Sequence, residues 1–67
     1  MIEISVNGEL KQIKEGLNIE ELVVELGYPK EGFAIAVNLT FVALREYKNT
    51  TIKAGDTIDI LAPVQGG

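Results

Sequence analysis

A chain of 67 residues is long enough for one small domain, and its 46% apolar content must stabilise that domain without disulfides, because the sequence has no cysteine. The absence of both cysteine and histidine also excludes a thiol nucleophile, an imidazole base and the usual soft metal site. Ten acidic against six basic residues give a formal charge of −4, which argues against a nucleic-acid-binding surface.

The N-terminal segment predicts a β-hairpin. In MIEISVN, residues 1–7, the isoleucines and the valine alternate with polar residues, as in a half-buried strand. Asn7-Gly8 follows, and this pair is the strongest short-range hairpin signal because both residues tolerate a positive φ. ELKQIK, residues 9–14, is the returning strand. Leu10 and Ile13 differ in parity there, so either a bulge intervenes or Leu10 faces solvent.

A helix with a marked beginning and end is predicted within GLNIEELVVELGYP, residues 16–29. Asn18 is a natural N-cap, and Glu21, three residues later, completes a capping-box pattern. Gly27 suits a left-handed C-terminal cap, and Pro29 prevents continuation. The apolar residues are spaced i, i+3, i+4 and i+7 and form one stripe, namely Ile19, Leu22, Val23 and Leu26.

Three strands are predicted in the second half of the chain. GFAIAVN, residues 32–38, alternates with Phe33, Ile35 and Val37 on one face, and a short turn at 38–40 leads to FVAL, residues 41–44. Residues 45–56 are polar and rich in turn formers, and they close on a tight turn at 54–56. TIDIL, residues 57–61, is the last strand.

The order of these elements predicts an α+β domain in which the helix packs across one face of a mixed sheet. A helical crossover favours a later strand parallel to the first. If that strand is 57–61, it lies centrally beside the first strand. Residues 62–67, APVQGG, then leave the sheet as a flexible tail of a single domain over 1–67, and Pro63 prevents the ladder from continuing.

Four stretches together resemble a known family: ISVNGE in the first hairpin, AVN ending the third strand, GDTIDIL, and the final QGG. They look like the ThiS/MoaD-like sulfur-carrier proteins of the ubiquitin-like β-grasp fold, with the thiamine-biosynthesis carriers as the closest branch. The resemblance covers essentially the whole chain and implies a mixed four- or five-stranded sheet with one helix on one face.

The resemblance implies a carrier with no catalytic residues, metal or bound cofactor of its own. A ubiquitin-activating-type adenylating enzyme, similar to ThiF or MoeB, uses ATP to activate the terminal carboxylate, which becomes a thiocarboxylate. A sulfur-accepting synthase such as thiazole synthase then takes the sulfur. Gly67 is the attachment site and Gly66 the spacer. The chemistry favours glycine independently, because a residue without Cβ leaves its carbonyl open to attack.

The sequence departs from the family pattern after the third strand, where Asn38-Leu39 replaces the common Asn-Gly. Leu39 either alters this turn or adds an exposed apolar contact. We expect Leu39 and Phe41 on the helix-free side of the sheet, and Leu61 and Val64 beside the root of the tail, as an apolar docking patch for the activating enzyme. The alternative is that Leu61 and Phe41 belong to the core.

Other functions remain open at this point. The proline in the tail is typical of the molybdopterin-synthase small subunit, whereas the shortness of the chain is typical of the thiamine branch. A carrier for tRNA thiolation, a ubiquitin-like protein modifier and a non-covalent β-grasp binding module are further alternatives. The N-terminus has no basic n-region, and FAIAV, the longest apolar run, is too short to cross a bilayer. We therefore expect a soluble cytoplasmic protein without membrane or nucleic-acid partners.

Overall fold

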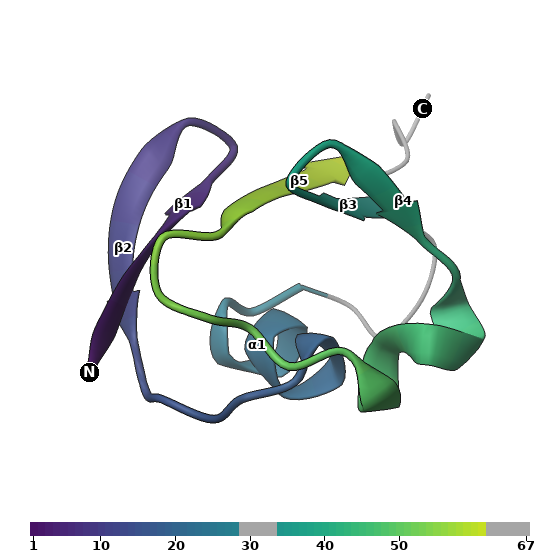
Figure 1. The fold of residues 1–67 in the computed structure, drawn as a ribbon, viewed down its shortest axis with the longest axis horizontal. Coiled ribbons are helices and arrows are strands. Elements are labelled where there is room, and N and C mark those ends of the chain that lie inside the picture. The colour runs from purple at the N-terminus through teal and green to yellow at the C-terminus, as the bar shows by residue number, and fades with distance from the viewer. Residues whose placement is uncertain (29–33, 62–67) are drawn as a thin grey trace.

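The computed structural model describes residues 1–28 and 34–61, which form a five-stranded mixed sheet with one α-helix on one face (Figure 1). The strands lie in the order β2-β1-β5-β3-β4. In chain order, the elements are β1 (Ile2–Val6), β2 (Glu9–Ile13), α1 (Ile19–Glu25), β3 (Ala34–Val37), β4 (Thr40–Val42), the 3₁₀ helix η1 (Leu44–Asn49) and β5 (Thr57–Leu61). The predicted fold class and the five-stranded form of the sheet are confirmed.

The predicted hairpin of β1 and β2 is confirmed. Asn7 and Gly8 both have a positive φ, +50° and +86°. The antiparallel register runs without interruption from Ile2 opposite Ile13 to the pair beside the turn. No bulge is needed, because Leu10 lies opposite Ser5 and is 71% exposed. The parity mismatch thus means that Leu10 faces solvent.

The two ends of α1 are fixed as the sequence predicts. The Asn18 side chain accepts a hydrogen bond from the Glu21 N–H (2.8 Å), and the Glu21 carboxylate accepts one from the Asn18 N–H (2.9 Å), which is a complete capping box. At the other end, Gly27 has φ +84°, and the N–H groups of Gly27 and Tyr28 donate to carbonyls of the last turn. The helix therefore begins and ends where its sequence signals lie.

β5 lies at the centre of the sheet, parallel to β1 and antiparallel to β3. This confirms the expected position of the last strand beside the first. The inward residues of the strands meet the apolar stripe of α1, which crosses one face of the sheet (Figure 1). The largest fully buried side chains are Ile4, Ile19, Leu22, Ile35, Ile52 and Ile58.

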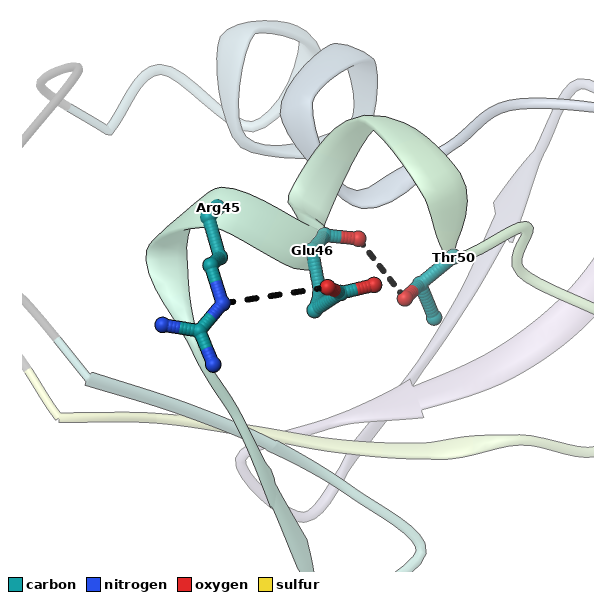
Figure 2. Close-up of polar contacts among 3 residues, drawn as sticks. All are labelled: Arg45, Glu46 and Thr50. Carbon is teal, nitrogen blue, oxygen red and sulfur yellow. Dashed lines mark hydrogen bonds and ion pairs between the residues drawn. The ribbon is translucent and has the colours of Figure 1, made fainter.

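The segment 45–56 is more ordered than its polar sequence predicts. Leu44–Asn49 form η1, which packs beside α1 and buries Tyr47. Figure 2 shows two contacts of Glu46: its carboxylate lies 3.9 Å from Nε of Arg45, and its carbonyl accepts a hydrogen bond from the Thr50 hydroxyl (2.8 Å). The prediction of a loop was wrong here, because a short 3₁₀ helix needs no long apolar period.

The β3–β4 connection is shorter than predicted. Val37 pairs directly with Thr40, so the turn contains only Asn38 and Leu39, and β4 covers 40–42 rather than 41–44. Leu44 is the first residue of η1, which is why the strand cannot reach it. The tight turn at 54–56 is confirmed by the hydrogen bond from the Asp56 N–H to the Lys53 carbonyl (3.1 Å).

Candidate docking face and strand end

The helix-free face of the sheet carries two of the predicted docking residues. Phe41 on β4 lies opposite Ala36, and Leu61 on β5 lies opposite Ala34, so β3 places only methyl groups between them. Phe41 is 68% exposed and Leu61 is 71% exposed. The alternative that these two side chains belong to the core is therefore wrong.

Leu39 occupies the tip of the β3–β4 turn. Its φ is +70°, and that of Asn38 is +52°, so the turn keeps the geometry for which Asn-Gly is usual. A leucine in this region costs roughly 1–2 kcal/mol in steric strain, yet the side chain is 87% exposed and gains little from burial. Replacing glycine thus leaves the turn unchanged and adds an exposed apolar group.

The predicted site residues are therefore only partly placed. Leu39 lies next to Thr40, at the end of the sheet where β5 begins, whereas Leu61 is the last residue of β5. Phe41 lies between these two positions. Val64, Gly66 and Gly67 lie outside the described residues, as does Phe33.

An acidic group accompanies the apolar residues of this face. Asp59 lies opposite Ala36, in the same cross-strand row as Phe41. It is half-buried. The patch formed by Phe41, Leu61, Ala34 and Ala36, hereafter the sheet patch, is thus apolar with one carboxylate beside it, a composition suited to an apolar protein surface with a basic edge.

Two asparagine side chains hold β5, and sequence reasoning missed both contacts. Asn38 Oδ1 accepts the Thr57 N–H (2.9 Å), while its amide donates to the Asp56 carboxylate (3.1 Å). Asn7 Oδ1 accepts the Ile60 N–H (2.7 Å). The turn signals identified both asparagines as turn formers, but hydrogen bonds to residues far along the chain leave no local sequence pattern.

A second surface feature lies between α1 and η1, away from the sheet patch. It is a groove of about 560 Å³ with exposed Val24 and Leu44 on its walls. Its lining is completed by Leu17, Glu20, Glu21, Val23, Glu25, Tyr47 and Lys48. The sequence did not predict this groove, because one of its walls is η1, which was expected to be a loop.

The described residues offer little chemistry of their own. Burial raises the pKa of the Tyr47 hydroxyl above its ordinary value of 10.0. Residues 1–28 and 34–61 contain no group of three acidic, histidine or cysteine side chains arranged to hold a metal ion. Within the same ranges, neither length nor hydropathy allows any helix to span a bilayer.

Comparison with solved structures gives close matches to this arrangement. The crystal structure of the thiamine biosynthesis protein ThiS from Geobacter metallireducens matches with a TM-score of 0.85 and 28% identity, over 98% of this chain and 100% of that one. The solution structure of a thiamine biosynthesis protein from the same organism matches with a TM-score of 0.84, also at 28% identity, over 98% of this chain and 88% of that one.

Sequence comparison agrees. The chain is 33% identical over 66 residues to the uncharacterised protein ycf40 of Porphyra purpurea, covering 98% of this chain and 93% of that protein. It is 29% identical over 66 residues to a thiazole synthase of Paramagnetospirillum magneticum, covering 98% of this chain but only 20% of that protein's length. The model of the ThiS family matches residues 4–67. The chain therefore belongs to the ThiS family.

Proposed function

We propose that this protein is the sulfur carrier of thiamine biosynthesis, which delivers sulfur for the thiazole ring as a thiocarboxylate on Gly67. The observation that carries the proposal is the family match over residues 4–67, which extends through both final glycines. The likeness to the crystal and solution structures of a thiamine biosynthesis protein of Geobacter metallireducens supports the same pathway.

The proposed chemistry requires an electrophilic carbonyl. A carboxylate is a poor electrophile at neutral pH, so an oxygen of Gly67 attacks the α-phosphate of ATP on the activating enzyme, and pyrophosphate leaves. A sulfide-level sulfur nucleophile then attacks the carbonyl carbon of the acyl adenylate, and AMP leaves with the bonding electron pair. The product is a C-terminal thiocarboxylate. In this scheme the carrier contributes only its terminal carboxylate, and both partner enzymes supply the acids, bases and nucleophiles.

The proposed acceptor is thiazole synthase. The Paramagnetospirillum magneticum protein of that name contains a segment similar to this chain within a much longer polypeptide, of which the chain spans 20%. A carrier segment within the same polypeptide as a synthase supports a functional partnership between the two activities. The proposal extends that partnership to a separate carrier.

The sheet patch is the proposed docking surface for the activating enzyme. Phe41 and Leu61 expose apolar area on the face that α1 leaves uncovered, and an exposed patch of this kind is typical of a protein-binding site. The formal charge of −4 favours a partner with a basic edge around an apolar centre. Val64 is included in this proposal on the basis of the sequence alone.

The test is an intact-mass measurement. The protein is incubated with ATP, a sulfide donor and the ubiquitin-activating-type adenylating enzyme of the thiamine pathway from the same organism. We expect the mass gain of one oxygen replaced by sulfur, and no gain in a chain that lacks Gly67.

The other functions give different results in the same measurement. A ladder of higher-mass conjugates would identify a protein modifier, and an unchanged mass with every activating enzyme would exclude a carrier. Transfer of the sulfur to molybdopterin synthase rather than thiazole synthase would correct the pathway while leaving the carrier chemistry intact.

A further inference from the structure

On the edge that faces β1, strand β5 extends beyond the last backbone hydrogen-bond partner that β1 provides. The Ser5 N–H donates to the Asp56 carbonyl, and the Asn7 N–H donates to the Ile58 carbonyl, both at 2.9 Å. Hydrogen-bonding groups on one edge recur every two residues, so the next group on this edge is the Ile60 N–H. No β1 backbone lies beside this N–H, because the chain leaves β1 at the Asn7-Gly8 turn.

The Asn7 side chain takes the place of the missing strand residue. Its Oδ1 accepts the Ile60 N–H at 2.7 Å, in a partly buried position. Asn7 thereby holds β5 at two successive points of one edge, once through its backbone N–H and once through its side chain. Ile60 is the penultimate residue of β5, directly before Leu61 and the sequence that leads to Gly67.

We propose that Asn7 is a positioning residue for sulfur transfer, fixing the end of β5 from which the chain continues towards Gly67. This inference rests on the proposed function. A carrier docks through its folded body while the reacting carbonyl must enter a partner's active site. A fixed strand end gives the terminal segment a constant starting point, and small errors in the placement of reacting groups are costly to rate.

Asn38 provides a matched control within the same molecule. It occupies the same turn position as Asn7, with φ +52° against +50°. Its Oδ1 also accepts a backbone N–H of β5, but that of Thr57, the first residue of the strand (2.9 Å). Loss of either amide removes a hydrogen bond to the same strand, and loss of the Asn38 amide also removes its bond to Asp56, yet only Asn7 holds the last residues of β5.

Three substitutions separate positioning from general stability. Asn7→Gly and Asn38→Gly keep a residue that accepts a positive φ and remove the side-chain acceptor. Asn7→Asp restores an acceptor oxygen at the same position. In amide hydrogen exchange, we expect the Ile60 N–H to exchange roughly three- to tenfold faster in Asn7→Gly, because one net hydrogen bond is lost. Asn7→Asp should stay near the wild-type rate, and Asn38→Gly should affect Thr57 instead.

Kinetics with the activating enzyme then test the role in transfer. We expect Asn7→Gly to lower kcat for thiocarboxylate formation severalfold with KM unchanged, and Asn7→Asp to restore kcat. Asn38→Gly should leave both constants near wild type.

Each other outcome is decisive. An unchanged Ile60 exchange rate in Asn7→Gly, an equal loss of kcat in the two glycine variants, or a rise in KM alone would overturn the role of Asn7. A wild-type chain that gains no sulfur would overturn the proposed function and the transfer role together. A wild-type chain that gains sulfur while Asn7→Gly matches its kcat would overturn the role of Asn7 alone.

Discussion

The two faces of the sheet are built from the same strands but have opposite environments. On the face under α1, Ile4, Ile35 and Ile58 are each at most 1% exposed. On the other face, Phe41 and Leu61 are more than two-thirds exposed. The strand sequence is apolar on both sides at these positions, so composition does not distinguish them. Packing against the helix buries the first set of side chains in the core, whereas the second set stays exposed without any contribution to that core.

The largest effect should come from truncation on the covered face. Ile58→Ala should lower the free energy of unfolding by about 2–5 kcal/mol, because it leaves a cavity at a fully buried position. Leu61→Ala, three residues further along the same strand, should change it by less than about 0.5 kcal/mol. Urea denaturation measures both. Similar losses in the two variants would mean that Leu61 is packed in solution.

The second-largest effect concerns the exposed aromatic residue of the sheet patch and its role in binding. Phe41→Ser should weaken binding to the activating enzyme by about tenfold or more, as expected for an exposed aromatic anchor, with little change in the urea midpoint. Binding is measured by titration calorimetry.

Leu10→Ser is the matched control for Phe41, since Leu10 is similarly exposed on the same face but lies on β2, at the opposite edge of the sheet from β4. If the two variants lose affinity equally, the whole face rather than the sheet patch binds the partner.

A smaller effect, of opposite sign, is expected at the β3–β4 turn. Leu39→Gly should raise the free energy of unfolding by about 0.5–1 kcal/mol, because glycine adopts the positive φ without strain. Leu10→Gly, at a position that is also exposed but extended, should lower it by about 0.5–1 kcal/mol. Thermal and urea unfolding would show the two signs. Destabilisation by Leu39→Gly would mean that the leucine side chain is packed.

The smallest effect is confined to alkaline solution. Burial raises the folded-state pKa of Tyr47 above that of the unfolded chain, so the unfolded chain loses its proton first as the pH rises. This contribution to stability is complete below pH 10 and is lost progressively above it. Tyr47→Phe should therefore reduce the fall in the unfolding midpoint between pH 9.5 and 11. An equal alkaline fall in the variant would mean that Tyr47 is not its cause.

The parts of the fold that sequence could predict are those with local physical signals. Asn7-Gly8 marked a hairpin, Asn18 and Glu21 marked the start of a helix, and alternation marked β5. The parts that it could not predict depend on distant partners. Tyr47 is buried only because η1 packs beside α1, and a 3₁₀ turn leaves no periodic trace in a polar segment.

The candidate site divides in the same way. Phe41 and Leu61 were singled out from the sequence and are exposed, whereas Gly66, Gly67 and Val64 stay predictions. The acceptor role of Asn7 was not found, since its partner Ile60 lies 53 residues away. The sequence marked Leu39 as a departure from the Asn-Gly pattern of the family. Only the structure shows that the turn keeps its geometry, with Leu39 at a positive φ that strains its backbone.

The parallel pairing of β1 with β5 has a practical consequence for handling the protein. Ser5, near the end of β1, lies beside Thr57, the first residue of β5. The start of β1 and the end of β5 therefore lie at opposite ends of this strand pair. Met1, which is 79% exposed, is thus at the far end of the strand pair from Leu61 (Figure 1). A fluorophore or an affinity tag attached at Met1 therefore leaves the opposite end clear, and immobilisation through it presents that end to whichever protein is passed over the surface.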